Sequence, residues 1–143
     1  MPRIALLNIL IGWSAIAIAA FGGVFIANDL SAGYIIKGQF SGAWEDVIRQ
    51  SSHGHFNMFG MLHILFGLTL PYSKLPAYLK KIQTMLLAFG LVAMGPMMLI
   101  RSTIKPSLNL GLVEILIGVF MSLSLVSVLS HIYGICLKLR RVS

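Results

Sequence analysis

The sequence has few charged residues and almost no cysteine. Only 10% of its 143 residues are Asp, Glu, Lys or Arg, whereas 57% are hydrophobic, and the mean hydropathy is +0.89. A soluble domain carries about a quarter charged residues, so this chain cannot cover a surface that faces water. The single cysteine, Cys136, excludes an internal disulfide. The composition therefore predicts one transmembrane domain, residues 1–143, in a lipid bilayer.

Acidic residues are also scarce, with four Asp and Glu against eleven Lys and Arg. They and Cys136 are not spaced from His53 or His63 in a way that suggests a mononuclear zinc or copper site. One predicted side of the membrane holds Arg3, Lys74, Lys80, Lys81, Lys138, Arg140 and Arg141. The other side holds Lys37, Arg49, Arg101 and Lys105. By the positive-inside rule, this distribution predicts cytoplasmic termini and attraction to membrane lipid, and it argues against nucleic acid as a partner.

Four long apolar segments predict four transmembrane helices. Each reaches the roughly 20 residues that a spanning helix needs, and backbone groups in lipid must be hydrogen-bonded internally. The predicted helices cover about residues 4–27, 52–71, 79–100 and 108–137, with an outer loop at 28–51. Pro96 predicts a kink in the third helix. The predicted fold class is all-α, an integral membrane four-helix bundle with both termini cytoplasmic.

Two of these segments have further implications. The first apolar run is longer than the 7–15 residues of a signal peptide, so we expect a retained membrane anchor. The outer loop contains five bulky apolar or aromatic side chains and is expected to fold back onto the outer membrane surface, where aromatic residues are enriched. These side chains are Tyr34, Ile35, Ile36, Phe40 and Trp44.

Most of the histidines lie in one segment, SSHGHFNMFGMLHILFG, residues 51–67. At roughly 100° per residue, one line on the helix carries His53, Asn57, Gly60, Ile64 and Gly67. Phe56 and His63 flank this line, and His55 points the opposite way. A histidine beside glycines offers a smooth strip for a flat group such as a porphyrin, and imidazole is a common axial ligand of haem iron. The candidate cofactor-binding residues are His53, Phe56, Asn57, Gly60, His63, Gly67 and Arg101, with His53 as the metal ligand.

A plainer interpretation exists for these residues. Small residues on membrane helices are often packing positions for a neighbouring helix, and a histidine near a helix end can simply reach the interface. We expect such an interfacial position for His131. His53 and His63 are about 15 Å apart along one helix axis, so they cannot both ligate one haem. A single-histidine haem, or one completed by a neighbouring subunit, is the simpler hypothesis.

The charged residues near the outer side also allow two interpretations each. Arg49, Arg101 and Lys105 either pair with haem propionates or anchor their helices at the lipid headgroups. Glu114, an acidic residue within a predicted span, pairs with Arg101 or His63 or carries a proton, and a structural ion pair is favoured.

Several short motifs between residues 33 and 71 are similar to one known family. They are Gly33-Tyr34-Ile35-Ile36, Trp44, His53, Gly60-Met61 and Leu70-Pro71, with matching spacing from His53 to Pro71. In these motifs the chain resembles the bacterial styrene oxide isomerases, four-helix membrane proteins that bind haem b. The resemblance implies a multi-pass protein of the bacterial inner membrane and a homotrimer with haem b at each subunit interface. It also implies that His53 is the axial ligand and that ferric iron acts as a Lewis acid on an epoxide, giving an aldehyde.

The chain departs from that family at polar positions. Phe59 stands where the family has an asparagine, and residues 89–100 contain neither the aspartate nor the tyrosine of the family's third helix. Asn57, one turn after His53, is a substitute for the missing amide. The sequence thus favours a haem b protein but leaves three functions open. They are an isomerase acting on an epoxide or related small apolar molecule, a membrane cytochrome for electron transfer or gas sensing, and a haem-free accessory bundle.

Overall fold

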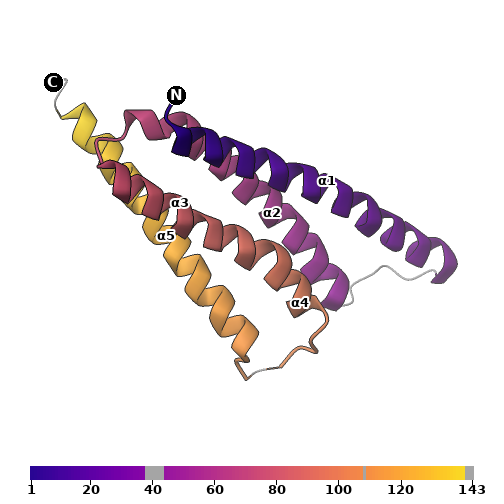
Figure 1. Cartoon of the computed structure of the whole chain (residues 1–143). Helices are drawn as coiled ribbons and strands as arrows, with labels where there is room; N and C mark the ends of the chain where they lie inside the picture. The colour runs from indigo at the N-terminus through magenta and orange to yellow at the C-terminus, as the bar shows by residue number, and fades with distance from the viewer. Residues whose placement is uncertain (38–43, 108, 141–143) are drawn as a thin grey trace.

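A computed structural model describes residues 1–37, 44–107 and 109–140. These residues form only helices and connections, with no strand. The elements are α1 (Arg3–Lys37), α2 (Trp44–Thr69), the 3-10 turn η1 (Leu70–Tyr72), α3 (Ala77–Val92), the π turn η2 (Ala93–Met97), α4 (Met98–Ser102) and α5 (Leu112–Leu139). Because α3, η2 and α4 follow one another without a break, the described chain consists of four long helical rods (Figure 1). The all-α prediction is confirmed for this part of the chain.

Three of the four rods are long and apolar enough to cross a membrane. They are Arg3–Ile36, Ala77–Ser102 and Leu112–Leu139. α2 is less apolar, because its first turns carry Glu45, Asp46 and Arg49 and the rest of it contains three histidines and Asn57. These three rods indicate a membrane protein.

Most of the predicted outer loop, residues 28–51, is helical. α1 continues to Lys37 and α2 begins at Trp44, while Phe40 lies outside the described residues. The apolar run ends near Asp29, but a charged residue ends a hydrophobic run without ending a helix. No proline falls between residues 28 and 51 to break the helical hydrogen bonds. The bulky side chains predicted for the loop therefore lie largely on helix ends.

α1 and α2 pack antiparallel through a seam of small residues. Ala5 and Gly12, seven residues apart on α1, face Gly67 and Gly60, seven apart on α2. A Cβ atom added to Gly67 would lie 2.6 Å from the Ala5 carbonyl oxygen, and one added to Gly60 would lie 3.0 Å from the Gly12 carbonyl oxygen. Small residues allow this close approach of two membrane helices. The packing interpretation of Gly60 and Gly67 is therefore correct in this structure.

The two ends of the bundle contain different elements. α1 starts, α5 ends and η1 leads into α3 at one end, called here the inner end, and Arg3 and Lys138 lie there (Figure 1). α1 ends, α2 starts and α4 leads towards α5 at the opposite, outer end, where Trp44 and Arg101 lie. The start of α1 and the end of α5 thus lie on the same side of the bundle.

Neutral hydrogen bonds join the helices in the inner half. Asn8 of α1 donates to the Thr84 hydroxyl at 2.8 Å, and its side-chain oxygen lies 3.0 Å from Nδ1 of His63. His131 of α5 is 6% exposed, lies 2.9 Å from the Thr69 hydroxyl and stacks on Phe66. The ring of His131, which we expect near the membrane interface, is thus buried against α2, which supplies both a polar and an aromatic partner.

A candidate ligand pocket around His53

A pocket of about 580 Å³ lies between α1, the outer half of α2 and the η2–α4 segment. Its volume is within the range of small-molecule sites, which are mostly apolar with a few polar groups. Two residues of the predicted site, His53 and Phe56, line it. The full lining is Ile18, Ala19, Gly22, Phe25, Ile26, Asp29, Arg49, Ser52, His53, Phe56, Gly95, Pro96 and Leu99.

The imidazole of His53 has unused hydrogen-bonding capacity. Its Nδ1 is buried and has no hydrogen-bond partner among the described residues. The Asn57 amide nitrogen lies 3.4 Å from Nε2 and donates to the His53 carbonyl at 3.2 Å. Buried polar atoms are nearly always paired in native proteins, so an unpaired imidazole nitrogen beside a pocket needs an explanation. Nε2 of His63 and Nδ1 of His131 are also buried without a partner among the described residues, and His53 differs from them because it lines the pocket.

The pocket lies where the small-residue seam ends. His53 precedes Gly60 by seven residues, so it occupies the next seam position on α2. Its ring packs on Gly23 of α1, where an added Cβ would lie 2.6 Å from Cε1 of His53. The neighbouring Ala19 and Gly22 line the pocket. An imidazole in a seam made of small residues keeps the helices apart, and short side chains opposite leave the space unfilled.

The wall opposite α1 is formed by the π turn. Pro96 has no N–H group to continue the α-helical pattern, and the chain forms one π turn at Ala93–Met97. The Ser52 hydroxyl lies 3.0 Å from the carbonyl oxygens of both Met94 and Gly95 and satisfies backbone groups there. Phe56 packs directly on Gly95, where no side chain fits. Ser52 was not singled out from the sequence. The available signal was a serine next to His53 together with Pro96 in another predicted span, because a proline leaves backbone carbonyls that need a donor.

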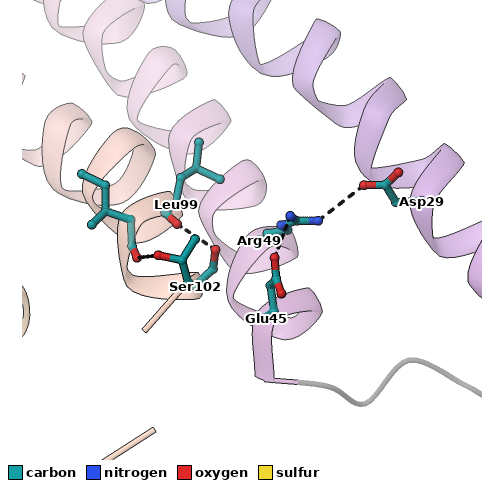
Figure 2. A network of polar contacts seen from close by, with 7 residues as sticks. Asp29, Glu45, Arg49, Leu99 and Ser102 are labelled. Atoms are coloured by element: carbon teal, nitrogen blue, oxygen red, sulfur yellow. Dashed lines mark hydrogen bonds and ion pairs between the residues drawn. The ribbon is translucent and has the colours of Figure 1, made fainter. Parts of the chain in front are cut away.

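A charged cluster borders the pocket at the outer end. Arg49 lies between Glu45 of its own helix and Asp29 of α1 (Figure 2), with nitrogen to oxygen distances of 2.7 and 3.4 Å. Arg49 and Asp29 both line the pocket. The side chain of Arg49 is 34% exposed, so its pair with Asp29 is weak and exchangeable. An anionic group on a bound ligand can therefore compete for this guanidinium.

The remaining predicted site residues lie elsewhere. α1 covers Gly60 and Gly67, and His63 is fully buried against Asn8. Asn57 lies beside His53 but does not line the pocket. His55 is exposed and bonds the Ser51 carbonyl at 2.8 Å, which confirms that it points away from the predicted face.

Arg101 belongs to a separate cluster. It is 7% exposed and forms an ion pair with Glu114 at 2.5 Å, which confirms the predicted structural pair. Its guanidinium also donates to the Ile104 carbonyl at 2.8 Å and lies over the Trp44 ring. Trp44 donates to the same carbonyl at 3.0 Å. These contacts join α2, α4 and α5, and they engage Arg101 away from the pocket.

The pocket offers one imidazole and apolar surface rather than a set of several metal ligands. The described residues contain no group of three or more His, Cys, Asp or Glu side chains that could hold a metal ion. Haem needs only one imidazole and an apolar environment for its ring. His53 offers an unpaired nitrogen, Phe56 and Pro96 offer apolar surface, and Arg49 offers a cation for propionates.

No family model matches the chain, and comparisons with curated proteins and with solved structures find no similar protein.

Proposed function

We propose that this chain is a membrane protein that binds haem b through His53 in the pocket between α1, α2 and α4. The observation that carries the proposal is His53, which lines an apolar pocket of about 580 Å³ and whose Nδ1 has no hydrogen-bond partner among the described residues. The resemblance of residues 33–71 to styrene oxide isomerases supports it independently. Part of the same proposal is a four-span topology in a bacterial inner membrane, with α2 as the fourth span and both termini cytoplasmic.

Each pocket residue has a role in this proposal. Phe56, Pro96 and Leu99 exclude water from the ring of the cofactor, because they supply apolar surface on two sides of the pocket. Asn57 bonds the His53 carbonyl and stays within 3.4 Å of Nε2, so it restricts rotation of the imidazole. Arg49 releases Asp29 and pairs with a propionate, which an exposed 3.4 Å ion pair allows.

Bound ferric haem supplies a Lewis acid for an oxygen atom of a small apolar molecule, which is the chemistry that the resemblance implies. The chain itself would contribute a mostly apolar pocket lining that accepts such a molecule, with Asp29 as the acidic residue in that lining. A homotrimer, also implied by the resemblance, would place a second subunit beside the lipid-facing side of this pocket.

An absorption spectrum of the purified protein tests haem binding. We expect a Soret band that His53→Ala abolishes, because the axial nitrogen is removed. His55→Ala is the matched control, since His55 lies on the same helix but is exposed and bonds only its own helical turn. Added imidazole should restore the band in the His53→Ala protein. Equal haem content in the two variants, or a band that neither variant changes, would refute the assignment.

Two further measurements separate catalysis from electron transfer. A five-coordinate ferric spectrum and conversion of an aryl epoxide to an aldehyde support isomerase chemistry. A six-coordinate bis-imidazole spectrum without aldehyde formation supports a cytochrome. Absence of haem from protein made in haem-replete cells would favour an accessory bundle.

A further inference from the structure

The inner end of the bundle is rich in cations and has no side-chain carboxylate of its own. All four acidic residues of the sequence, Asp29, Glu45, Asp46 and Glu114, lie in the outer half. The ion pairs found among the described residues involve only outer-end carboxylates. The inner-end cations in the described part of the chain include Arg3, Lys74, Lys80, Lys81 and Lys138. The side chains of this end therefore supply no carboxylate to pair with its cations.

Two of these cations lie at one groove. A hollow of about 620 Å³ is formed by the first turns of α1 and the start of α3, and its lining is Arg3, Ile4, Leu6, Leu7, Leu10 and Lys81. Leu6, Leu7 and Leu10 are 52%, 44% and 63% exposed. No hydrogen bond or ion pair of the Arg3 or Lys81 side chain occurs among the described residues. Cationic groups thus border a hollow whose remaining lining is apolar.

This arrangement matches the chemistry of an anionic phospholipid. A phosphate takes hydrogen bonds and charge from Arg and Lys, and an acyl chain packs on exposed leucines. α3 begins at Ala77 without a side-chain cap, so the positive end of its helix dipole lies near the same place. A free phosphate would gain nothing from Leu6, Leu7 and Leu10.

We propose that this groove is a specific anionic phospholipid site, with the phosphate between Arg3 and Lys81 and an acyl chain along Leu6, Leu7 and Leu10. The site lies at the opposite end of the bundle from the His53 pocket. It does not depend on haem binding, and either proposal can fail without the other.

Retained lipid, measured by native mass spectrometry of the full chain, tests the site. We expect phosphatidylglycerol to bind the wild-type protein more tightly than phosphatidylcholine with the same acyl chains. A cation near an anionic lipid contributes a factor of about five in affinity, so Arg3→Gln/Lys81→Gln should weaken phosphatidylglycerol binding roughly 25-fold. Both side chains are exposed, and helical content from circular dichroism checks that the variant folds.

The control variant is Lys74→Gln/Lys105→Gln, which removes the same charge outside the groove. It should bind phosphatidylglycerol within about twofold of wild type. Equal losses in the two double variants would show general surface attraction and overturn the site. Inorganic phosphate and glycerol phosphate serve as further probes in the same measurement. If either one bound as tightly as phosphatidylglycerol, the proposal would also be overturned. Equal affinity for phosphatidylcholine would do the same.

Discussion

At the inner end, the helices meet through glycine contacts and neutral hydrogen bonds, whereas at the outer end long charged side chains add ion pairs between them. Gly67 lies against the backbone of α1, and Asn8 joins α1 to α2 and α3. At the outer end, Arg101 joins α4 to α5 and Arg49 joins α2 to α1. Backbone contact leaves no room between α1 and α2, while a long side chain spans a gap. The His53 pocket between these two helices is therefore found in the outer half.

The largest effect on stability is expected from the buried outer pair. Arg101→Met leaves the Glu114 carboxylate without its partner at a site where Arg101 is 7% exposed. Breaking a buried ion pair costs about 3 kcal/mol of unfolding free energy. The midpoint of heat or SDS denaturation, followed by circular dichroism, measures this loss. The double variant Arg101→Met/Glu114→Leu should recover much of it, and a double variant as unstable as the single would contradict the ion-pair explanation.

A methyl group in the inner seam should have the next largest effect. Gly67→Ala places a Cβ 2.6 Å from the Ala5 carbonyl oxygen, so α1 and α2 must separate. We expect a loss of about 1–3 kcal/mol in the same denaturation experiment. Gly54→Ala is the control on the same helix, because a Cβ there meets nothing within 4 Å. It should be neutral or stabilise by up to about 1 kcal/mol, and the same sign for both variants would argue against close packing at Gly67.

A smaller effect is expected from the inner hydrogen bonds. Asn8→Leu removes the bonds to Thr84 and His63, and interhelical hydrogen bonds in membranes contribute about 0.6 kcal/mol each. The predicted loss is therefore about 1 kcal/mol. Ser122→Ala, which removes only a bond to Gly118 of its own helix, should change stability by less than about 0.5 kcal/mol. If the two variants lose the same amount, the neutral network does not hold the inner end together.

The smallest effect is expected from the exposed outer pair. Arg49→Gln removes contacts to Asp29 and Glu45 that water reaches, and such pairs contribute between about 0 and 1 kcal/mol. Added salt should reduce the difference between wild type and variant further. If Arg49→Gln lost as much unfolding free energy as Arg101→Met, the difference in exposure between the two arginines would not explain their contributions to stability.

Hydropathy is sufficient to locate the four rods, but not their ends at Lys37 and Trp44. A hydrophobic run reports where lipid contact is favourable, whereas a helix continues until its backbone hydrogen bonding is interrupted. The pair between Arg101 and Glu114 was also predictable, because both positions flank the same short connection and each needs a partner of opposite charge.

The choice between His53 and His63 could not be made from periodicity. Both lie near one face of α2, and their difference comes from the residues that α1 places opposite them. Each histidine has one buried nitrogen without a partner among the described residues, but His63 is fully buried beside Asn8, whereas His53 packs on Gly23 and lines the pocket. Which part of α1 meets which part of α2 is set by the seam of small residues, and the pattern of a single helix does not contain that information.

The π turn at Ala93–Met97 also sets the direction in which the end of its rod faces. Such a turn holds one residue more than an α turn, so everything after it is rotated by about 100° relative to a straight continuation. A helical wheel drawn through Gly95 as if the helix were regular would assign Arg101 to the wrong sector. The buried arginine at the outer end is therefore a matter of helical phase: a single extra residue, in the outer third of the span Ala77–Ser102, directs its charge inward.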